Sequence, residues 1–498
     1  MGYLPGPTLR LRTMFSYAGF IWTLVGLLML ASLAVLPFAD GEAAWSWAFL
    51  YPASALLLGG LTTWRVARPR TYVTLTLQDG GVVVLLGWIV CCIAATWPFL
   101  SILNLTFTQA LFETVSGFTT TGLSVVDVTT APKIILLWRS LMQLAGGAGL
   151  AIIMLAAIAG PAGTSLSGAE GRSDQLAPHV RSSATLVLVI YSAYALAGSL
   201  AYRIAGMEWF DAVNHAFAAI STGGFSTRPE SIGYWNSSEI ELVTVVLMIL
   251  GNLNFVTAYL LLTGKWRSVL KNGELRFSLL LFLAAAGLLF WFVAHHGYTG
   301  LGKQVRVALF EAVTAATTTG FSTVGYTGWP AIGWLVMLLL MLVGGGTGST
   351  AGGIKQYRVY LLIKSVWWEI KRALLPRGSV PAESIWMGER PKFIDDSDLR
   401  RATCFVTLYL ACFTLGVGIM VAYGYPLRES LFEYASSIGT VGLSIGITSA
   451  DTPPAVLWTQ IMGMFLGRLE FFIVFIAALH AGKIVLPIIS RRKRPARS

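Results

Sequence analysis

The chain alternates between long apolar segments and short polar connections. Uncharged runs cover residues 14–39, 43–64, 80–112, 140–169, 242–264, 312–354 and 402–427. Each run exceeds the roughly 20 residues that a helix needs to cross the hydrocarbon core of a bilayer. We expect membrane-spanning helices near residues 14–38, 44–64, 78–100, 131–160, 183–205, 239–264, 277–296, 330–363, 399–424 and 455–488. This pattern predicts an all-α polytopic membrane protein with about ten transmembrane helices.

Composition and charge agree with a membrane protein. Of the 498 residues, 55% are apolar and only 12% are charged, whereas charged residues make up roughly a quarter of a soluble protein. The net charge of +11 does not point to nucleic acid, because most of the 35 Lys and Arg residues fall in alternate connections, most densely at residues 355–401 and 483–497. Such loops face the cytoplasm. We expect a multi-pass protein of the cytoplasmic (inner) membrane, surrounded by lipid bilayer, with both termini cytoplasmic.

A short motif, Thr-x-Gly-[Leu/Phe]-Ser, occurs four times along the chain. The copies lie at residues 120–124, 222–226, 318–322 and 440–444. Nine residues before each motif glycine stand Glu113, His215, Glu311 and Glu433. The apolar stretch before each motif is too short to span a bilayer, which favours a half-helix that enters the membrane and turns back. Turn composition in a Gly-rich protein is the alternative, but four copies at matching places favour a repeat.

The repeat divides the chain into six parts. We expect two N-terminal transmembrane helices (residues 1–72), pore unit 1 (73–165), pore unit 2 (166–266), pore unit 3 with a Gly-rich intramembrane loop (267–370), a cytosolic loop (371–398), and pore unit 4 with a basic C-terminal tail (399–498). Irregular backbone inside a membrane is tolerated where it lines a water-filled path. The four units are therefore expected to surround a central pore.

The motif residues are candidates for a cation selectivity filter. Backbone carbonyls from four extended segments can replace the hydration shell of an ion, and the C-terminal ends of four half-helices would favour a cation. The predicted filter residues are Thr120, Thr121, Gly122, Thr222, Gly223, Gly224, Thr318, Thr319, Gly320, Thr440, Val441 and Gly442.

A second glycine cluster interrupts the span near residues 330–363. The predicted gate residues in this segment are Gly345, Gly346, Gly348, Ser349, Thr350, Gly352 and Gly353. Each glycine in a helix interior costs about 1 kcal/mol relative to alanine, so we favour a flexible loop below the filter. Close helix packing through small residues is the alternative.

Arg468 lies near the middle of the last predicted span. Ionisable residues within a membrane are rare and are functional candidates. We expect the Arg468 guanidinium to face the pore below the filter and to oppose cation passage, so that it forms part of the gate. A buried pair with an acidic residue of another helix is the alternative.

These strings together resemble the Trk/Ktr/HKT superfamily of potassium-translocating subunits, and specifically the TrkH type. The likeness rests on Thr-Gly-Gly-Phe-Ser at 222–226, on residues 209–215 before it, on Gly-Ser-Thr-Ala-Gly-Gly-Ile-Lys at 348–355, and on Gly-Arg-Leu-Glu-Phe-Phe at 467–472. The resemblance implies a potassium pathway with a pseudo-fourfold selectivity filter and a gate at the Gly-rich loop. It also implies a homodimer and a cytosolic nucleotide-binding regulatory subunit similar to TrkA.

The sequence thus predicts gated, channel-like uptake of K⁺, with K⁺ held at the filter residues and no organic cofactor. A symporter that couples K⁺ to Na⁺ or H⁺ on the same fold is the main alternative. An alternating-access carrier is less favoured, because the two-span units are parallel rather than inverted repeats. The five histidines form no catalytic arrangement, so we expect no enzyme.

Overall fold

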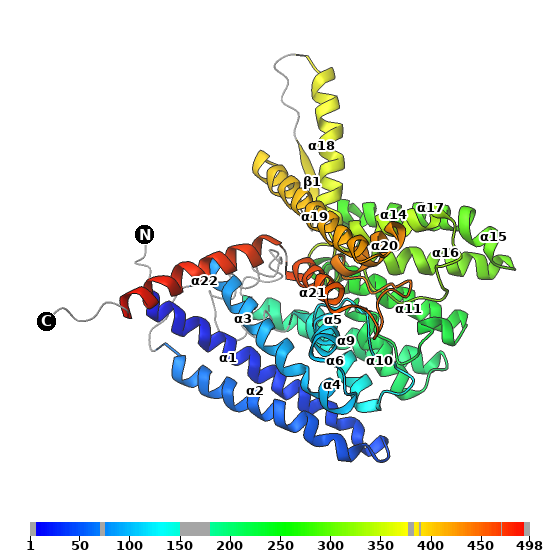
Figure 1. Ribbon diagram of the computed structural model, residues 1–498. Coiled ribbons are helices and arrows are strands. Elements are labelled where there is room, and N and C mark those ends of the chain that lie inside the picture. Colours follow the sequence, from blue (N-terminus) through cyan, green and yellow to red (C-terminus); the bar gives the residue numbers. More distant parts are fainter. Residues whose placement is uncertain are drawn as a thin grey trace.

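The computed structural model describes residues 6–69, 75–149, 180–376, 383–387, 390–469 and 471–492, and these residues are mostly helical (Figure 1). The N-terminal part comprises α1 (Pro7–Ala31), η1 (Ser32–Phe38), η2 (Glu42–Trp45) and α2 (Ser46–Ala67). Unit 1 comprises α3 (Leu77–Ala95), α4 (Trp97–Ile102), α5 (Phe107–Phe118) and α6 (Lys133–Ala148). Unit 2 comprises α9 (Val180–Ile204), α10 (Trp209–Ile220), η3 (Ser231–Tyr234), α11 (Ser238–Asn252) and α12 (Phe255–Leu262).

The second half of the chain follows the same plan. Unit 3 comprises α13 (Trp266–Lys271), α14 (Gly273–Leu289), the π-helical turn η4 (Phe290–Ala294), α15 (His295–Gly297), α16 (Leu301–Ala316), α17 (Ala331–Val343) and α18 (Gln356–Leu374). Two strands follow, β1 (Ser384–Met387) and β2 (Arg390–Phe393). Unit 4 comprises α19 (Asp396–Ala422), α20 (Leu427–Ile438), α21 (Pro454–Leu469) and α22 (Phe471–Arg492). The expected boundaries between residues 72 and 73 and between 165 and 166 lie outside the described residues.

The expected polytopic, all-helical architecture is confirmed. Within the described residues, six helical segments are long and apolar enough to cross a membrane, at 8–38, 42–67, 78–102, 186–204, 273–297 and 396–422. Two bent pairs can each form a further span: α11 with α12, at an angle of 113°, and α21 with α22, at 98°.

The second helix of each unit is short or bent, so the spans expected at 239–264, 330–363 and 455–488 are not single straight helices. The helix α6 ends before Gly149, whose φ is 62°, and residues 150–160 lie outside the described part of the chain. The helix α17 ends before Gly344, whose φ is 71°. A residue with positive φ interrupts a helix, and glycine adopts a positive φ without a steric penalty. The sequence predicted such a break in unit 3 alone.

Helix packing joins the four units in a ring. The second helix of each unit packs on the half-helix of the next: α6 on α10, α11 on α16, α17 on α20, and α21 on α5. The last of these contacts returns from unit 4 to unit 1. The cyclic order places the four half-helices, and the motifs that follow them, around one axis.

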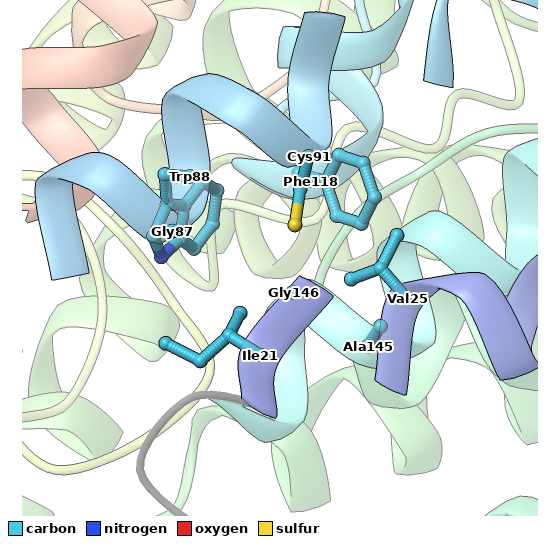
Figure 2. Close-up of a pocket in the computed structure, with 8 residues that line it drawn as sticks. All are labelled: Ile21, Val25, Gly87, Trp88, Cys91, Phe118, Ala145 and Gly146. Carbon is cyan, nitrogen blue, oxygen red and sulfur yellow. The ribbon is translucent and has the colours of Figure 1, made fainter. Parts of the chain in front are cut away.

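The N-terminal helices cover the outside of unit 1. The helix α1 packs on α2 and α3, and Arg10 of α1 binds Asp79 of α3 at 2.6 Å. His480 of α22 contacts the same carboxylate at 3.0 Å, so the first turns of α1 and α3 lie beside the middle of α22. A small apolar cavity of about 30 Å³ lies between α1 and the helices of unit 1 (Figure 2). Its lining includes Ile21 of α1 and Phe118 of α5. Its apolar lining makes it a packing void rather than an ion path.

A β-hairpin lies within the segment expected to be a cytosolic loop. Strand β1 pairs antiparallel with β2, with Ser384 opposite Phe393. Buried Ile385 packs with Leu361 of α18 and Ala402 of α19. Figure 1 shows α18 and β1 projecting from the helical bundle. The sequence analysis missed this hairpin, because a pair of four-residue strands carries little periodic signal.

Candidate functional site: a ring of four Thr-x-Gly segments

The four motifs begin at the C-terminal ends of the half-helices α5, α10, α16 and α20. Each half-helix ends in a turn in which the backbone N–H of the motif's second residue donates to a carbonyl of the last helical turn. These bonds run from Thr121 to Ser116, Gly223 to Ala218, Thr319 to Thr314 and Val441 to Ser436. This is the hydrogen bonding of a helix C-cap, which normally places glycine in the left-handed position.

Threonine occupies that left-handed position in all four motifs. The φ angles are 56° at Thr120, 52° at Thr222, 54° at Thr318 and 52° at Thr440. Positive φ in a β-branched residue is an outlier, and such strain clusters at functional sites. Its repetition at four equivalent positions makes the motif threonines candidate functional residues.

The motif glycines close the ring. Their φ angles are 92° at Gly122, 71° at Gly224, 85° at Gly320 and 99° at Gly442. A Cβ atom on each would collide with the backbone carbonyl oxygen of the next unit: Gly223 for Gly122, Thr319 for Gly224, Val441 for Gly320 and Thr121 for Gly442. All twelve predicted filter residues therefore lie in one closed arrangement of four backbone segments. Glycine is required both by its φ and by the space.

The residue nine positions before each motif glycine forms a hydrogen bond with the extended segment at the end of the motif or directly after it. Buried carboxylates accept a backbone N–H twelve residues further on: Glu113 from Val125 at 3.1 Å, Glu311 from Thr323 at 2.9 Å, and Glu433 from Ile445 at 3.1 Å. In unit 2, His215 Nε2 lies 2.9 Å from Ser226 Oγ instead. These side chains are structural anchors of the ring.

A cavity of about 330 Å³ lies outside the ring and is lined by all four motif glycines. Two of its arginines form ion pairs, Arg139 with Glu113 and Arg228 with Asp211, each at 2.7 Å, which offsets their repulsion of cations. Asp127 also lines the cavity, and its pKa is lowered because the Thr129 hydroxyl and backbone N–H donate to the carboxylate. The mouth thus has an aspartate that stays ionised at neutral pH.

The predicted gate residues lie in one irregular, mostly buried loop, residues 344–355, which contacts the ring. The Thr350 hydroxyl contacts that of Thr222 at 3.1 Å, and the Gly352 N–H donates to Thr318 Oγ1 at 2.8 Å. A Cβ on Gly352 would collide with Thr440 Oγ1. The loop therefore touches the motifs of three units. These glycines do not lie in a helix. The alternative of close helix packing through small residues required that they do.

The gate loop is held by polar side chains of unit 2. Asn252 Oδ1 accepts from the Gly346 N–H at 2.7 Å, and Asn254 Nδ2 donates to the Thr347 carbonyl at 2.7 Å. The other predicted gate residues fit this arrangement: the Ser349 hydroxyl donates to the Gly346 carbonyl, Gly345 lies against Asn252, Gly348 against Asn254, and Gly353 against Gly344. The sequence analysis missed both asparagines. Polar residues inside an apolar span were the available signal.

Arg468, at the end of α21, connects the gate loop to unit 1. Its guanidinium donates to the carbonyl of Thr350 and, at 2.6 Å, to that of Gly146 in α6. Arg468 therefore lies against the loop of residues 344–355. The contacts with two carbonyls describe a tether of the loop, which the sequence did not predict.

Two polar side chains of α6 also contact the ring and were missed. Arg139 donates to the Ser226 carbonyl at 3.2 Å, and Gln143 Nε2 donates to the Gly223 carbonyl at 2.5 Å. Both lie on one face of α6, four residues apart. Their presence in an apolar span was again the only sequence signal.

Comparison with known proteins agrees with this geometry. The sequence model of the TrkH family, described as a cation transport protein, matches residues 52–485. The chain is 31% identical to the Trk system potassium uptake protein TrkG of Escherichia coli K12, over 94% of this chain and 98% of that protein. It is 30% identical to the Trk system potassium uptake protein TrkH of Vibrio parahaemolyticus, again over 94% and 98%.

The fold also matches a solved structure. The crystal structure of the potassium transporter TrkH from Vibrio parahaemolyticus superposes with a TM-score of 0.80, at 30% identity, and covers 94% of this chain and 98% of that one. Both matches cover most of the sequence. The chain therefore belongs to the TrkH family of cation transport proteins.

Proposed function

We propose that this protein takes up K⁺ across the cytoplasmic membrane through a selective, gated, channel-like pore. The observation that carries the proposal is the closed ring of four Thr-x-Gly segments, in which each motif glycine faces a backbone carbonyl of the next unit. Rings of backbone carbonyls replace the hydration shell of K⁺. The names of the relatives, which are potassium uptake proteins, support the same ion.

The filter in this proposal consists of the twelve motif residues. Carbonyls of Thr121, Gly223, Thr319 and Val441 form its upper ring, next to the glycines. Below them, the hydroxyls of Thr120 and Thr440 are buried and have no hydrogen-bond partner among the described residues. An oxygen with free lone pairs is a ligand for a cation that has lost part of its water. The four half-helices end at this level and direct their negative dipole ends toward the ion.

The gate in this proposal is the loop of residues 344–355 together with Arg468. The loop touches three filter threonines from the inner side, and Arg468 ties it to α6. An ion that leaves the filter would meet this loop and the guanidinium charge. Opening then requires movement of the loop, which glycines with positive φ at positions 344, 348 and 353 permit.

The proposed topology places both termini in the cytoplasm of a cell with an inner membrane. The first turn of α1 and the middle of α22 lie together through Arg10, Asp79 and His480. Most basic residues fall in connections that this topology places inside.

We propose two partners in the assembled system. An apolar stripe on α18, formed by Ile363, Val366, Trp367 and Ile370, is exposed and suits the homodimer that the family resemblance implies. The neighbouring basic loop and hairpin suit a nucleotide-binding subunit that resembles TrkA. Size-exclusion chromatography with light scattering tests the dimer.

Tracer uptake into proteoliposomes that contain the purified chain tests the function. We expect radioactive rubidium to enter down its gradient and radioactive sodium to enter much more slowly, with no added sodium or proton gradient. Equal entry of both ions would contradict selectivity. Rubidium entry that requires a proton or sodium gradient would replace the channel by a coupled symporter on the same fold.

A further inference from the structure

A side chain that does not belong to the four motifs forms hydrogen bonds with one of them. Gln143 of α6 is completely buried and forms two hydrogen bonds to the extended motif segment of unit 2, residues 222–226, which we call its filter strand. Its Nε2 donates to the Gly223 carbonyl at 2.5 Å, and its Oε1 accepts from the Phe225 N–H at 3.1 Å. The amide therefore pins this strand on both sides of Gly224.

The Gln143 contact is an exception to the fourfold pattern. Gln143 lies three residues before Gly146 in the second helix of unit 1. In units 2, 3 and 4 a buried methionine lies three residues before the corresponding glycine: Met248 before Gly251, Met341 before Gly344 and Met464 before Gly467. In units 1, 2 and 4 that glycine lies against the last carbonyls of the half-helix, at Phe118, Ile220 and Ile438.

The strand that Gln143 touches shows a matching exception. The middle motif residue is Thr121, Thr319 or Val441 in three units, but Gly223 in unit 2. The φ of Gly223 is not positive, so the backbone does not require glycine there. A Cβ on Gly223 would collide with Gln143, which supplies all three of the nearest atoms. Gln143 and Gly223 thus fit each other as a pair.

The position of this pair gives it a consequence for ion selection. The carbonyl of Gly223 belongs to the upper ring of the filter and faces Gly122 across the join between units 1 and 2. A carbonyl held by an amide donor has a fixed direction, and it cannot swing inward to shorten its distance to a smaller cation. In the snug-fit account of the preference for K⁺ over Na⁺, carbonyls held at fixed positions suit K⁺ and coordinate the smaller Na⁺ poorly.

We propose that Gln143 is a positioning residue that sets the K⁺ over Na⁺ selectivity of the filter by holding the Gly223 carbonyl. This role rests on the proposed function and names the side chain that maintains its selectivity. The filter then departs from fourfold symmetry at its middle position. Three strands carry side chains at the middle position, and the fourth carries an amide from the neighbouring unit in place of its own side chain.

The variant Gln143→Met tests the proposal, because it installs the residue of the other three units and removes both hydrogen bonds. Reversal potentials in planar bilayers give the permeability ratio of Na⁺ to K⁺. We expect this ratio to rise about fivefold, the effect of losing one net hydrogen bond. The matched control is Ser140→Ala on the same helix, whose hydroxyl bonds only the Leu136 carbonyl in the described structure, and its ratio should equal that of the wild type.

The double variant Gln143→Met with Gly223→Thr rebuilds the pairing of unit 3. We expect it to recover K⁺ preference relative to Gln143→Met, whereas Gly223→Thr alone should have lower preference because the new side chain collides with Gln143. A merely structural role of Gln143 would lower the yield of folded protein or total current but would leave the permeability ratio unchanged.

A further variant covers the case in which Gln143→Met does not fold. Gln143→Leu removes both hydrogen bonds with a side chain that is smaller than methionine. A wild-type permeability ratio in Gln143→Met, or in Gln143→Leu when Gln143→Met does not fold, overturns the proposal. Absence of K⁺ preference in the wild type would instead overturn the proposed function, so the two failures are distinguishable.

Discussion

Threonine in a left-handed conformation recurs at four equivalent positions of this molecule. Each such residue costs on the order of 1–3 kcal/mol of backbone strain and persists only where its surroundings impose the conformation. Here the C-cap hydrogen bonds of the half-helices and the glycine contacts of the next unit impose it. Glycine would fit the same backbone without strain, so retention of threonine indicates that the hydroxyl has a role. We assign that role to the lower part of the filter.

The variant Gly320→Ser tests the fit of the ring at the level of one residue. The added Cβ collides with the Val441 carbonyl, and a side chain at φ of 85° is strained. We expect the preference for rubidium over sodium in tracer uptake to fall about tenfold, which corresponds to about 1.4 kcal/mol. Gly328→Ser is the matched control, because a Cβ there meets nothing within 4 Å. Unchanged preference in Gly320→Ser would contradict the closed ring.

Asp127 at the outer mouth gives a second prediction at this scale. Its carboxylate should concentrate cations near the filter, so Asp127→Asn should weaken the apparent affinity for K⁺ by about twofold at low ionic strength, as exposed charges do. Since its pKa is lowered from 3.8, the charge is lost only under strong acid. The contribution of Asp127 to uptake should therefore stay constant between about pH 5 and 8.

Uptake kinetics at low and high salt measure this effect of Asp127. The exposed Asp451, which does not line the cavity, supplies the control Asp451→Asn. An equal effect of both substitutions would indicate a general surface-charge effect rather than a role for the mouth.

At the scale of elements, the broken second helices distinguish this fold from a bundle of straight spans. The helix α17 gives way to the gate loop, and α11 bends into α12 directly beside it. Asn252 and Asn254, at that bend, bind the loop. The bend between α11 and α12 therefore stabilises the loop that follows α17. Irregular backbone at this depth is stable because protein polar groups satisfy it.

Arg468 tests the role of the gate loop. In Arg468→Ala the loop loses its bond to α6, and the inner end of the filter loses a positive charge. We expect K⁺ uptake without regulatory partners to rise at least about tenfold, because even one lost hydrogen bond to a charged group is worth about 1.5 kcal/mol. Arg468→Lys separates the two causes, since lysine keeps the charge but lacks the guanidinium fork that contacts two carbonyls. Unchanged uptake and ion dependence in Arg468→Ala would exclude Arg468 from the gate.

The sequence could predict the parts of the site that repeat. The Thr-x-Gly motif and the Glu or His nine residues earlier recur, so their equivalence was visible without a structure. The contacts of Gln143, Arg139 and Asn252 occur once, between units, and depend on how helices pack. The hairpin β1–β2 and the bend between α11 and α12 depend on tertiary contacts in the same way. Local patterns do not encode such contacts.

At the scale of the whole molecule, each unit depends on the next. The second helix of one unit packs on the half-helix of the following one, and the motif glycines follow the same cyclic order. The N-terminal helices and α22 reinforce unit 1 from outside. This arrangement places the four motifs around one axis within one chain.

The contacts of Asp79 test this reinforcement. Asp79→Asn removes the ion pair with Arg10 and weakens the contact with His480, so α1, α3 and α22 lose a common anchor. We expect a loss of about 2 kcal/mol in stability, as for hydrogen bonds to charged groups. Thermal unfolding in detergent measures it, with Asp451→Asn as a surface control. Selectivity should not change, and a change would mean that this outer cluster acts on the filter.

Localisation of bound rubidium tests the central claim most directly. Anomalous diffraction from crystals grown in rubidium should show density on the axis of the ring, at the level of the motif glycines and the four left-handed threonines. Replacement by sodium should remove that density. Rubidium bound elsewhere in the chain, or no ordered ion within the ring at high rubidium concentration, would contradict the assignment of the four Thr-x-Gly segments as the filter.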